Sequence, residues 1–144
     1  MDLTTIQPNR GLGALRFGMS RPAVRQGFMD AHDTFTRAEQ AFDERDEEVD
    51  AYDALGIHLH YDEDNALEYI ELFPPASPTW EGLHLLNLSL DDIEQAMTTR
   101  GHSVSRDDTG LDVRSLGIGV YSENGLRPQA VSVYREGYYE GLDV

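Results

Sequence analysis

The chain of 144 residues is 40% hydrophobic, contains no cysteine and carries a formal net charge of −16. This size and hydrophobic content suffice for one compact domain or for two half-size repeats that share a core. The lack of cysteine excludes disulfides, thiolate metal sites and cysteine nucleophiles. The acidity argues against nucleic acid as a direct partner, because phosphate binding relies on clustered Lys and Arg.

All 11 basic residues are arginine, and two interpretations of the acidic composition stay open. Either the negative field steers a protein partner with a basic surface, or a solvated acidic surface keeps the chain soluble in a saline cytoplasm. In the second case the arginine bias reflects codon usage. The sequence names neither the partner nor the oligomeric state.

No segment approaches the roughly 18 consecutive apolar residues that a membrane-spanning helix requires. The first residues, MDLTTIQPNRG, do not combine a basic region with an apolar one, as a secretion signal would. We therefore expect a cytoplasmic protein without a membrane partner.

Residues 1–10 are polar, which predicts an arm or a short edge strand. A helix is predicted over residues 21–31, because Ser20 can accept hydrogen bonds from the free amides of a helix start. Val24 and Phe28 are four residues apart and would lie on the buried side of this helix. The cap gives Ser20 a structural role and makes catalysis by this serine an inferior explanation.

The same features recur 69 residues later. Ser89 and Asp92 form an S-x-x-D capping box, Ile93 and Met97 form the apolar stripe, and Gly101 ends the predicted helix. This second helix follows the segment PPASPT, the only linker-like stretch in the chain.

The hydrophobic pattern after each helix has a period of two residues, as in β-strands. Short strands bounded by turns favour antiparallel pairing. The predicted strands are residues 34–38, 49–54, 56–61 and 67–73 after the first helix, and 102–106, 111–115, 117–121 and 129–134 after the second.

The acidic connection over residues 39–53 contains eight carboxylates. A block of like charge is typical of a solvated loop. An amphipathic helix is the rival interpretation, because the apolar residues of this region have approximately helical spacing, namely Ala38, Phe42, Val49 and Tyr52.

These patterns predict an internal duplication, since residues 11–30 align with 80–99 and residues 55–73 align with 116–134. The predicted fold class is α+β, with two tandem repeats that each consist of one helix followed by a roughly four-stranded antiparallel sheet. The first repeat covers residues 1–78 and the second covers residues 79–144, together forming one compact unit.

His58 and His60 lie two residues apart on a predicted strand, so both side chains leave the same face and could hold two positions of a metal. A third ligand is not evident, and Glu71 on the next strand is the nearest candidate for that position. We expect no metal site and no cofactor, because neither a complete ligand set nor a catalytic set stands out.

The solvent face of the predicted sheet is the strongest candidate for a binding surface. Aromatic side chains on an open sheet face are typical of protein interfaces, although cross-strand aromatic pairing for stability would explain the same residues. The candidate partner-binding residues are His58, His60, Tyr69, Glu71, Phe73, Tyr121 and Tyr134.

The segment Phe17-Gly18-Met19-Ser20-Arg21, followed by Val24, is similar to the F-G-M-T/S-x-x-x-V signature that opens each repeat of the β-lactamase inhibitor protein family. The lipoprotein BamE resembles that family, and both place such a segment before an antiparallel sheet. The chain also resembles small acidic immunity partners of bacterial toxins. Because it lacks the disulfide cysteines of the inhibitor and the lipidation cysteine of the lipoprotein, neither function is carried over.

We therefore expect a non-catalytic, acidic module, of the inhibitor or immunity-protein kind, that binds a basic protein partner through an exposed sheet face. The alternative is a small-molecule or metal-binding enzyme that uses the strand of His58 and His60. A deep pocket containing both histidines and Glu71 would favour the enzyme.

Overall fold

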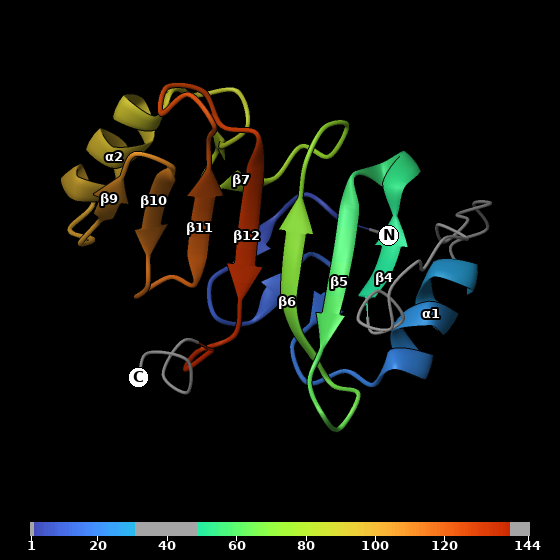
Figure 1. The fold of residues 1–144 in the computed structure, drawn as a ribbon. Helices are drawn as coiled ribbons and strands as arrows, with labels where there is room; N and C mark the ends of the chain where they lie inside the picture. Colours follow the sequence, from blue (N-terminus) through green and yellow to red (C-terminus); the bar gives the residue numbers. More distant parts are fainter. Residues whose placement is uncertain (1, 31–48, 139–144) are drawn as a thin grey trace.

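The computed structural model describes residues 2–30 and 49–138 (Figure 1). These residues contain twelve strands in three antiparallel sheets, two α-helices and one short 3₁₀ turn. In chain order the elements are β1 (Ile6–Gln7), β2 (Gly11–Leu12), β3 (Leu15–Arg16), α1 (Arg21–Asp30), β4 (Val49–Tyr52), the 3₁₀ turn η2 (Asp53–Leu55), β5 (Ile57–Tyr61), β6 (Leu67–Leu72), β7 (Thr79–Trp80), β8 (Leu83–His84), α2 (Leu90–Thr99), β9 (Ser105–Asp107), β10 (Gly110–Val113), β11 (Ile118–Tyr121) and β12 (Ala130–Tyr134).

A single seven-stranded sheet dominates the fold, with the strand order β4-β5-β6-β12-β11-β10-β9. Strand β6 comes from the middle of the sequence and pairs with β12 from near its C-terminal end, in a register that places Tyr69 opposite Tyr134 and Glu71 opposite Ser132. Helix α1 lies at the β4 end of the sheet and α2 at the β9 end, while β1 to β3 lie behind it (Figure 1). Strands from before and after α2 therefore form one sheet.

The predicted fold class is wrong. The described residues are mostly β, with twelve strands and only two helices, rather than two tandem repeats of one helix and a four-stranded sheet. Strand β6 pairs with β12 because two sheets that ended there would each expose a row of unpaired backbone groups. The predicted strand over residues 34–38 and the acidic residues 39–48 lie outside the described residues, and the remainder of the acidic connection is β4 and the start of η2.

Two short hairpins, β2-β3 and β7-β8, precede the two helices in segments where the sequence pattern predicts no strands. Their strands are only two residues long, too short to show an alternating pattern. The second hairpin lies against the first residues of the chain, where the Thr79 amide donates to the Thr4 carbonyl at 2.7 Å.

Both predicted helices are confirmed, and their starts follow local chemistry. The Ser89 hydroxyl accepts from the Asp92 amide at 3.1 Å, as the capping box requires. The Ser20 hydroxyl accepts from the Ala23 amide at 3.2 Å in the same manner. The serines are therefore helix caps in the structure.

The hydrophobic core is one cluster between the inner face of the central sheet and the helices and hairpins. Strand alternation directs one face of each central strand into it. The apolar residues that alternate with the predicted outer-face residues on the four central strands are all buried, namely Ile57, Leu59, Ile70, Leu72, Ile118, Val120, Val131 and Val133.

A buried carboxylate joins α1 to the edge of the central sheet. Asp50 of β4 is fully buried, and the Arg25 guanidinium donates to its two oxygens at 2.8 and 2.6 Å. The Tyr61 hydroxyl donates to the same carboxylate at 3.3 Å, and Arg21 lies 3.7 Å from it. Because a charge inside a core must be compensated, this cluster orients the helix against the sheet.

Candidate functional site

The outer face of the central sheet presents a continuous cross-strand row of mostly polar residues. Because neighbouring strands are in register, side chains at paired positions leave the same face. Counted from β4 to β9, the row is Ala51, His58, Glu71, Ser132, Gly119, Asp112 and Ser105.

A second row on this face is aromatic. The rings of His60 and Tyr69 meet edge to face at 5.1 Å between centroids, and Tyr69 stacks on Tyr134 at 6.3 Å. Tyr138 lies 5.1 Å from Tyr69 and 5.9 Å from Tyr134. The contacts of His60, Tyr69 and Tyr134 join β5, β6 and β12 across the face, as expected for aromatic cross-strand pairs.

Tyr134 is not exposed as predicted, since only 3% of its surface is accessible. Its hydroxyl donates to Asp112 Oδ1 at 2.6 Å, and its ring lies against Tyr69 and Tyr138. A side chain in this position orients its neighbours and cannot offer a large contact area to a partner.

His58 and His60 have different surroundings despite leaving the same face. His58 Nε2 lies 2.7 Å from Asp53 Oδ1, and His58 Nδ1 lies 4.0 Å from Glu71 Oε1. The Phe73 ring meets the His58 ring edge to face at 4.8 Å. His58 is therefore held among carboxylates and one aromatic ring at the β5 side of the face.

His60 Nε2 is buried and has no hydrogen-bond partner among the described residues. Burial lowers the pKa of His60, with Glu71 opposing and His58 reinforcing this shift. Across the described part of the chain, no three His, Cys, Asp or Glu residues are arranged to hold a metal ion.

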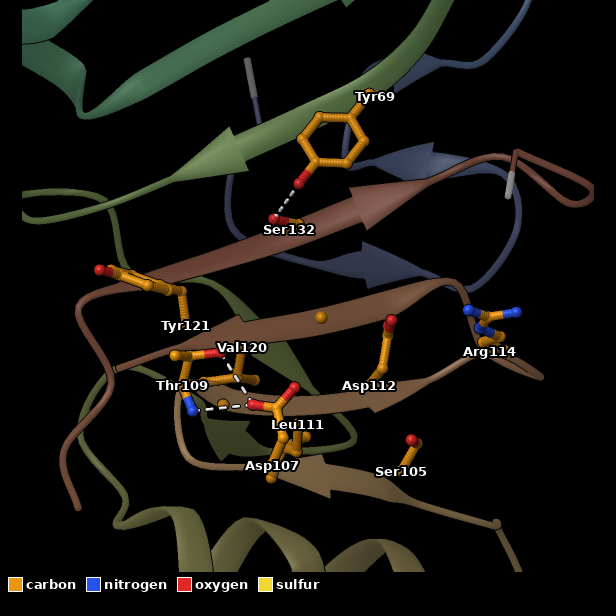
Figure 2. Close-up of a pocket in the computed structure, with 12 residues that line it drawn as sticks. Tyr69, Ser105, Asp107, Thr109, Leu111, Asp112, Arg114, Val120, Tyr121 and Ser132 are labelled. Carbon is orange, nitrogen blue, oxygen red and sulfur yellow. Dashed lines mark hydrogen bonds between the residues drawn. The ribbon is translucent and has the colours of Figure 1, made fainter. Parts of the chain in front are cut away.

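A groove of about 340 Å³ lies over the β9 to β12 half of the face (Figure 2). Its floor contains Gly119, which has no side chain to fill the space between the neighbouring strands. Tyr69 and Ser132 lie on one side and Asp107 and Asp112 on the other (Figure 2). The lining residues are Tyr69, Ser105, Asp107, Thr109, Gly110, Leu111, Asp112, Arg114, Gly119, Val120, Tyr121 and Ser132.

Hydrogen bonds hold the polar groups of this groove in place. The Tyr69 hydroxyl donates to Ser132 Oγ at 2.5 Å, and the Thr109 amide and hydroxyl donate to Asp107 Oδ1 at 2.7 and 2.8 Å. The bond from the Thr109 hydroxyl has the largest effect on the pKa of Asp107, and both Thr109 bonds lower it. The carboxylate of Asp107 is therefore ionised at neutral pH.

The structure divides the predicted site residues between two regions. Tyr69 and Tyr121 line the groove, and 48% of the Tyr121 surface is accessible. Four half-buried candidates lie on the β5 and β6 side of the face, and these are His58, His60, Glu71 and Phe73.

The sequence prediction omits Asp107, Asp112 and Gly119 from the site. A signal for Asp112 exists, because it stands between Leu111 and Val113, whose burial on β10 sends the intervening side chain outward. No local pattern marks Gly119 as a groove floor, since that property depends on the strands paired on either side.

No family model, no curated protein and no solved structure matches the chain. Neither helix of the described residues is long and apolar enough to cross a membrane.

Proposed function

We propose that this chain is a non-catalytic, acidic, cytoplasmic module that binds a basic protein partner through the outer face of its seven-stranded sheet. The observation that carries the proposal is the face itself, where aromatic side chains and a groove lie on strands that the core holds rigidly. Aromatic residues are enriched at protein interfaces, and rigid elements present a surface with little cost of ordering.

Charge supplies the second argument. A net charge of −16 produces a field that raises the encounter rate with a basic protein. This field is screened beyond about 8 Å at physiological salt, so it acts on association more than on the assembled complex. Buried aromatic anchors determine dissociation, and each contributes about 2 kcal/mol or more.

The described residues do not support the alternative, an enzyme that uses the strand of His58 and His60. The groove lies on the other half of the sheet and includes neither histidine. His58 is close to Asp53, and the Nε2 atom of His60 is buried.

The test is quantitative affinity capture from the native cell with three immobilised proteins: the wild type, Tyr69→Ala and Leu126→Ala. Leu126 is a matched control, because it is 62% exposed and belongs to the connection between β11 and β12. We expect a protein that the wild type and the control retain and that Tyr69→Ala loses. Retention by all three proteins alike would refute the sheet-face site.

A captured protein is then purified and titrated by surface plasmon resonance. We expect Tyr69→Ala to weaken the affinity about thirtyfold, chiefly through faster dissociation, as loss of about 2 kcal/mol implies. Added salt should slow association in the wild type and in both variants. An association rate that does not respond to salt would contradict the steering argument.

A further inference from the structure

The space directly above Gly119 has defined walls. A Cβ atom at this position would lie 3.4 Å from Asp112 Oδ1 and 3.7 Å from Ser132 Cβ. Any side chain longer than a methyl group would therefore extend between a carboxylate and a hydroxyl group. At about 340 Å³ the groove lies at the small end of ligand pockets, which suits one long side chain.

The two walls are oriented before any ligand arrives. The Tyr134 hydroxyl holds Asp112 at 2.6 Å, and the Tyr69 hydroxyl holds Ser132 at 2.5 Å. The two tyrosine rings also stack on each other. Because these contacts restrict both polar groups, a ligand that binds them loses little free energy to ordering the site.

The charge of the lining favours a cation. Asp107 and Asp112 are its two carboxylates, and Arg114 is the only cationic side chain among the lining residues of the described chain. Arg114 stands at one end, opposite Tyr121 (Figure 2). The field of the whole chain, with its net charge of −16, acts in the same direction.

We propose that this groove receives an arginine side chain of the protein partner, with the guanidinium directed at Asp112. The proposal rests on the proposed function and adds the chemistry that the sheet face recognises. A guanidinium is planar, donates several hydrogen bonds to carboxylates and hydroxyls, and stacks on tyrosine rings. The lining of the groove fits this ligand, since Tyr69 and Tyr121 supply rings and Ser132 supplies an acceptor.

The test uses a small probe, so that it does not require the partner. N-acetyl-arginine amide is titrated into the ¹⁵N-labelled full chain, and amide shifts are followed by NMR. N-acetyl-citrulline amide is the matched probe, because it has nearly the same shape without the charge. We expect saturable shifts centred on Gly119 and Asp112 with the arginine probe, and binding at least about tenfold weaker with citrulline, as loss of about 1.4 kcal/mol implies.

Two variants locate the binding. Asp112→Asn keeps an acceptor for the Tyr134 hydroxyl but removes the charge, and Gly119→Leu fills the groove without a left-handed backbone to strain. Both variants should bind the arginine probe about tenfold more weakly than the wild type does. Gly119→Ala is the control and should retain most of the affinity. If Gly119→Leu does not fold, Asp112→Asn alone decides the question.

Equal binding of both probes, or equal binding to the wild type and Asp112→Asn, would overturn the arginine site. These outcomes are distinct from failure of the proposed function. Capture that depends on Tyr69 without arginine binding would leave the sheet-face function standing and refute the groove. Arginine binding at Gly119 without a captured partner would support the arginine site and refute the sheet-face function.

Discussion

Replacing Arg25 by methionine removes two hydrogen bonds to the buried Asp50 carboxylate while it keeps an unbranched aliphatic side chain. Arg25 donates two hydrogen bonds to this carboxylate, and these bonds also raise the pKa of Arg25. A charge-assisted hydrogen bond contributes about 1.5–3 kcal/mol. The Arg25 side chain is 39% exposed, so solvent screening places each bond at the low end of that range.

Part of the loss is offset, because Arg21 at 3.7 Å and the Tyr61 hydroxyl at 3.3 Å still face Asp50 in the variant. We therefore expect Arg25→Met to lower the free energy of unfolding by about 2 kcal/mol. Urea denaturation followed by circular dichroism measures this change. If the slope of the unfolding free energy against urea concentration is the same in both proteins, they unfold between comparable states.

Arg100→Met is the matched control, because Arg100 contacts Glu81 at 3.1 Å on the protein surface. An exposed ion pair contributes about 1 kcal/mol or less. The double variant Arg25→Met with Asp50→Leu should be more stable than the sum of its single variants predicts, since it removes the buried carboxylate together with the guanidinium that compensates it. An Arg25→Met cost no greater than that of Arg100→Met would refute the reasoning.

Three further predictions concern caps, glycines and pH. Ser89→Ala should lower the free energy of unfolding by about 1 kcal/mol, because α2 loses its cap, and urea denaturation measures this. Gly117→Ala should unfold at a lower urea concentration than Gly119→Ala, because Gly117 has a φ of 68° and Gly119 is not left-handed; equal midpoints would contradict this. Burial lowers the pKa of His60 from 6.5, so the unfolded chain binds a proton first as pH falls. Stability should be retained above pH 6.5 and fall below it by up to about 1.4 kcal/mol per pH unit, and His60→Phe should reduce that slope; an unchanged slope would exclude His60 as its source.

Local chemistry accounts for the elements that could be predicted. Ser20 and Ser89 mark helix starts because a hydroxyl three residues before an amide can cap it without help from distant parts of the chain. Alternation in β5 places Ile57 and Leu59 in the core, where both are buried, because successive side chains of any strand point to opposite faces.

The candidate site was predictable only in part, because exposure depends on what packs nearby. Alternation alone places Tyr134 on the outer face together with Tyr69. The structure buries Tyr134, since Tyr69 and Tyr138 cover its ring and Asp112 accepts its hydroxyl. The same alternating pattern therefore leaves Tyr69 at the surface and buries Tyr134 beneath its neighbours.

The sequence by itself determined the helix starts, the positions of the main strands and the side of each strand that faces the core, because all three depend on neighbours within a few residues. Only the tertiary structure decided that β6 pairs with β12 to form one sheet and that Gly119 lies between Asp112 and Ser132. These features depend on backbone hydrogen bonds between segments far apart in the chain. A periodic pattern carries no information about which strand edge will meet another.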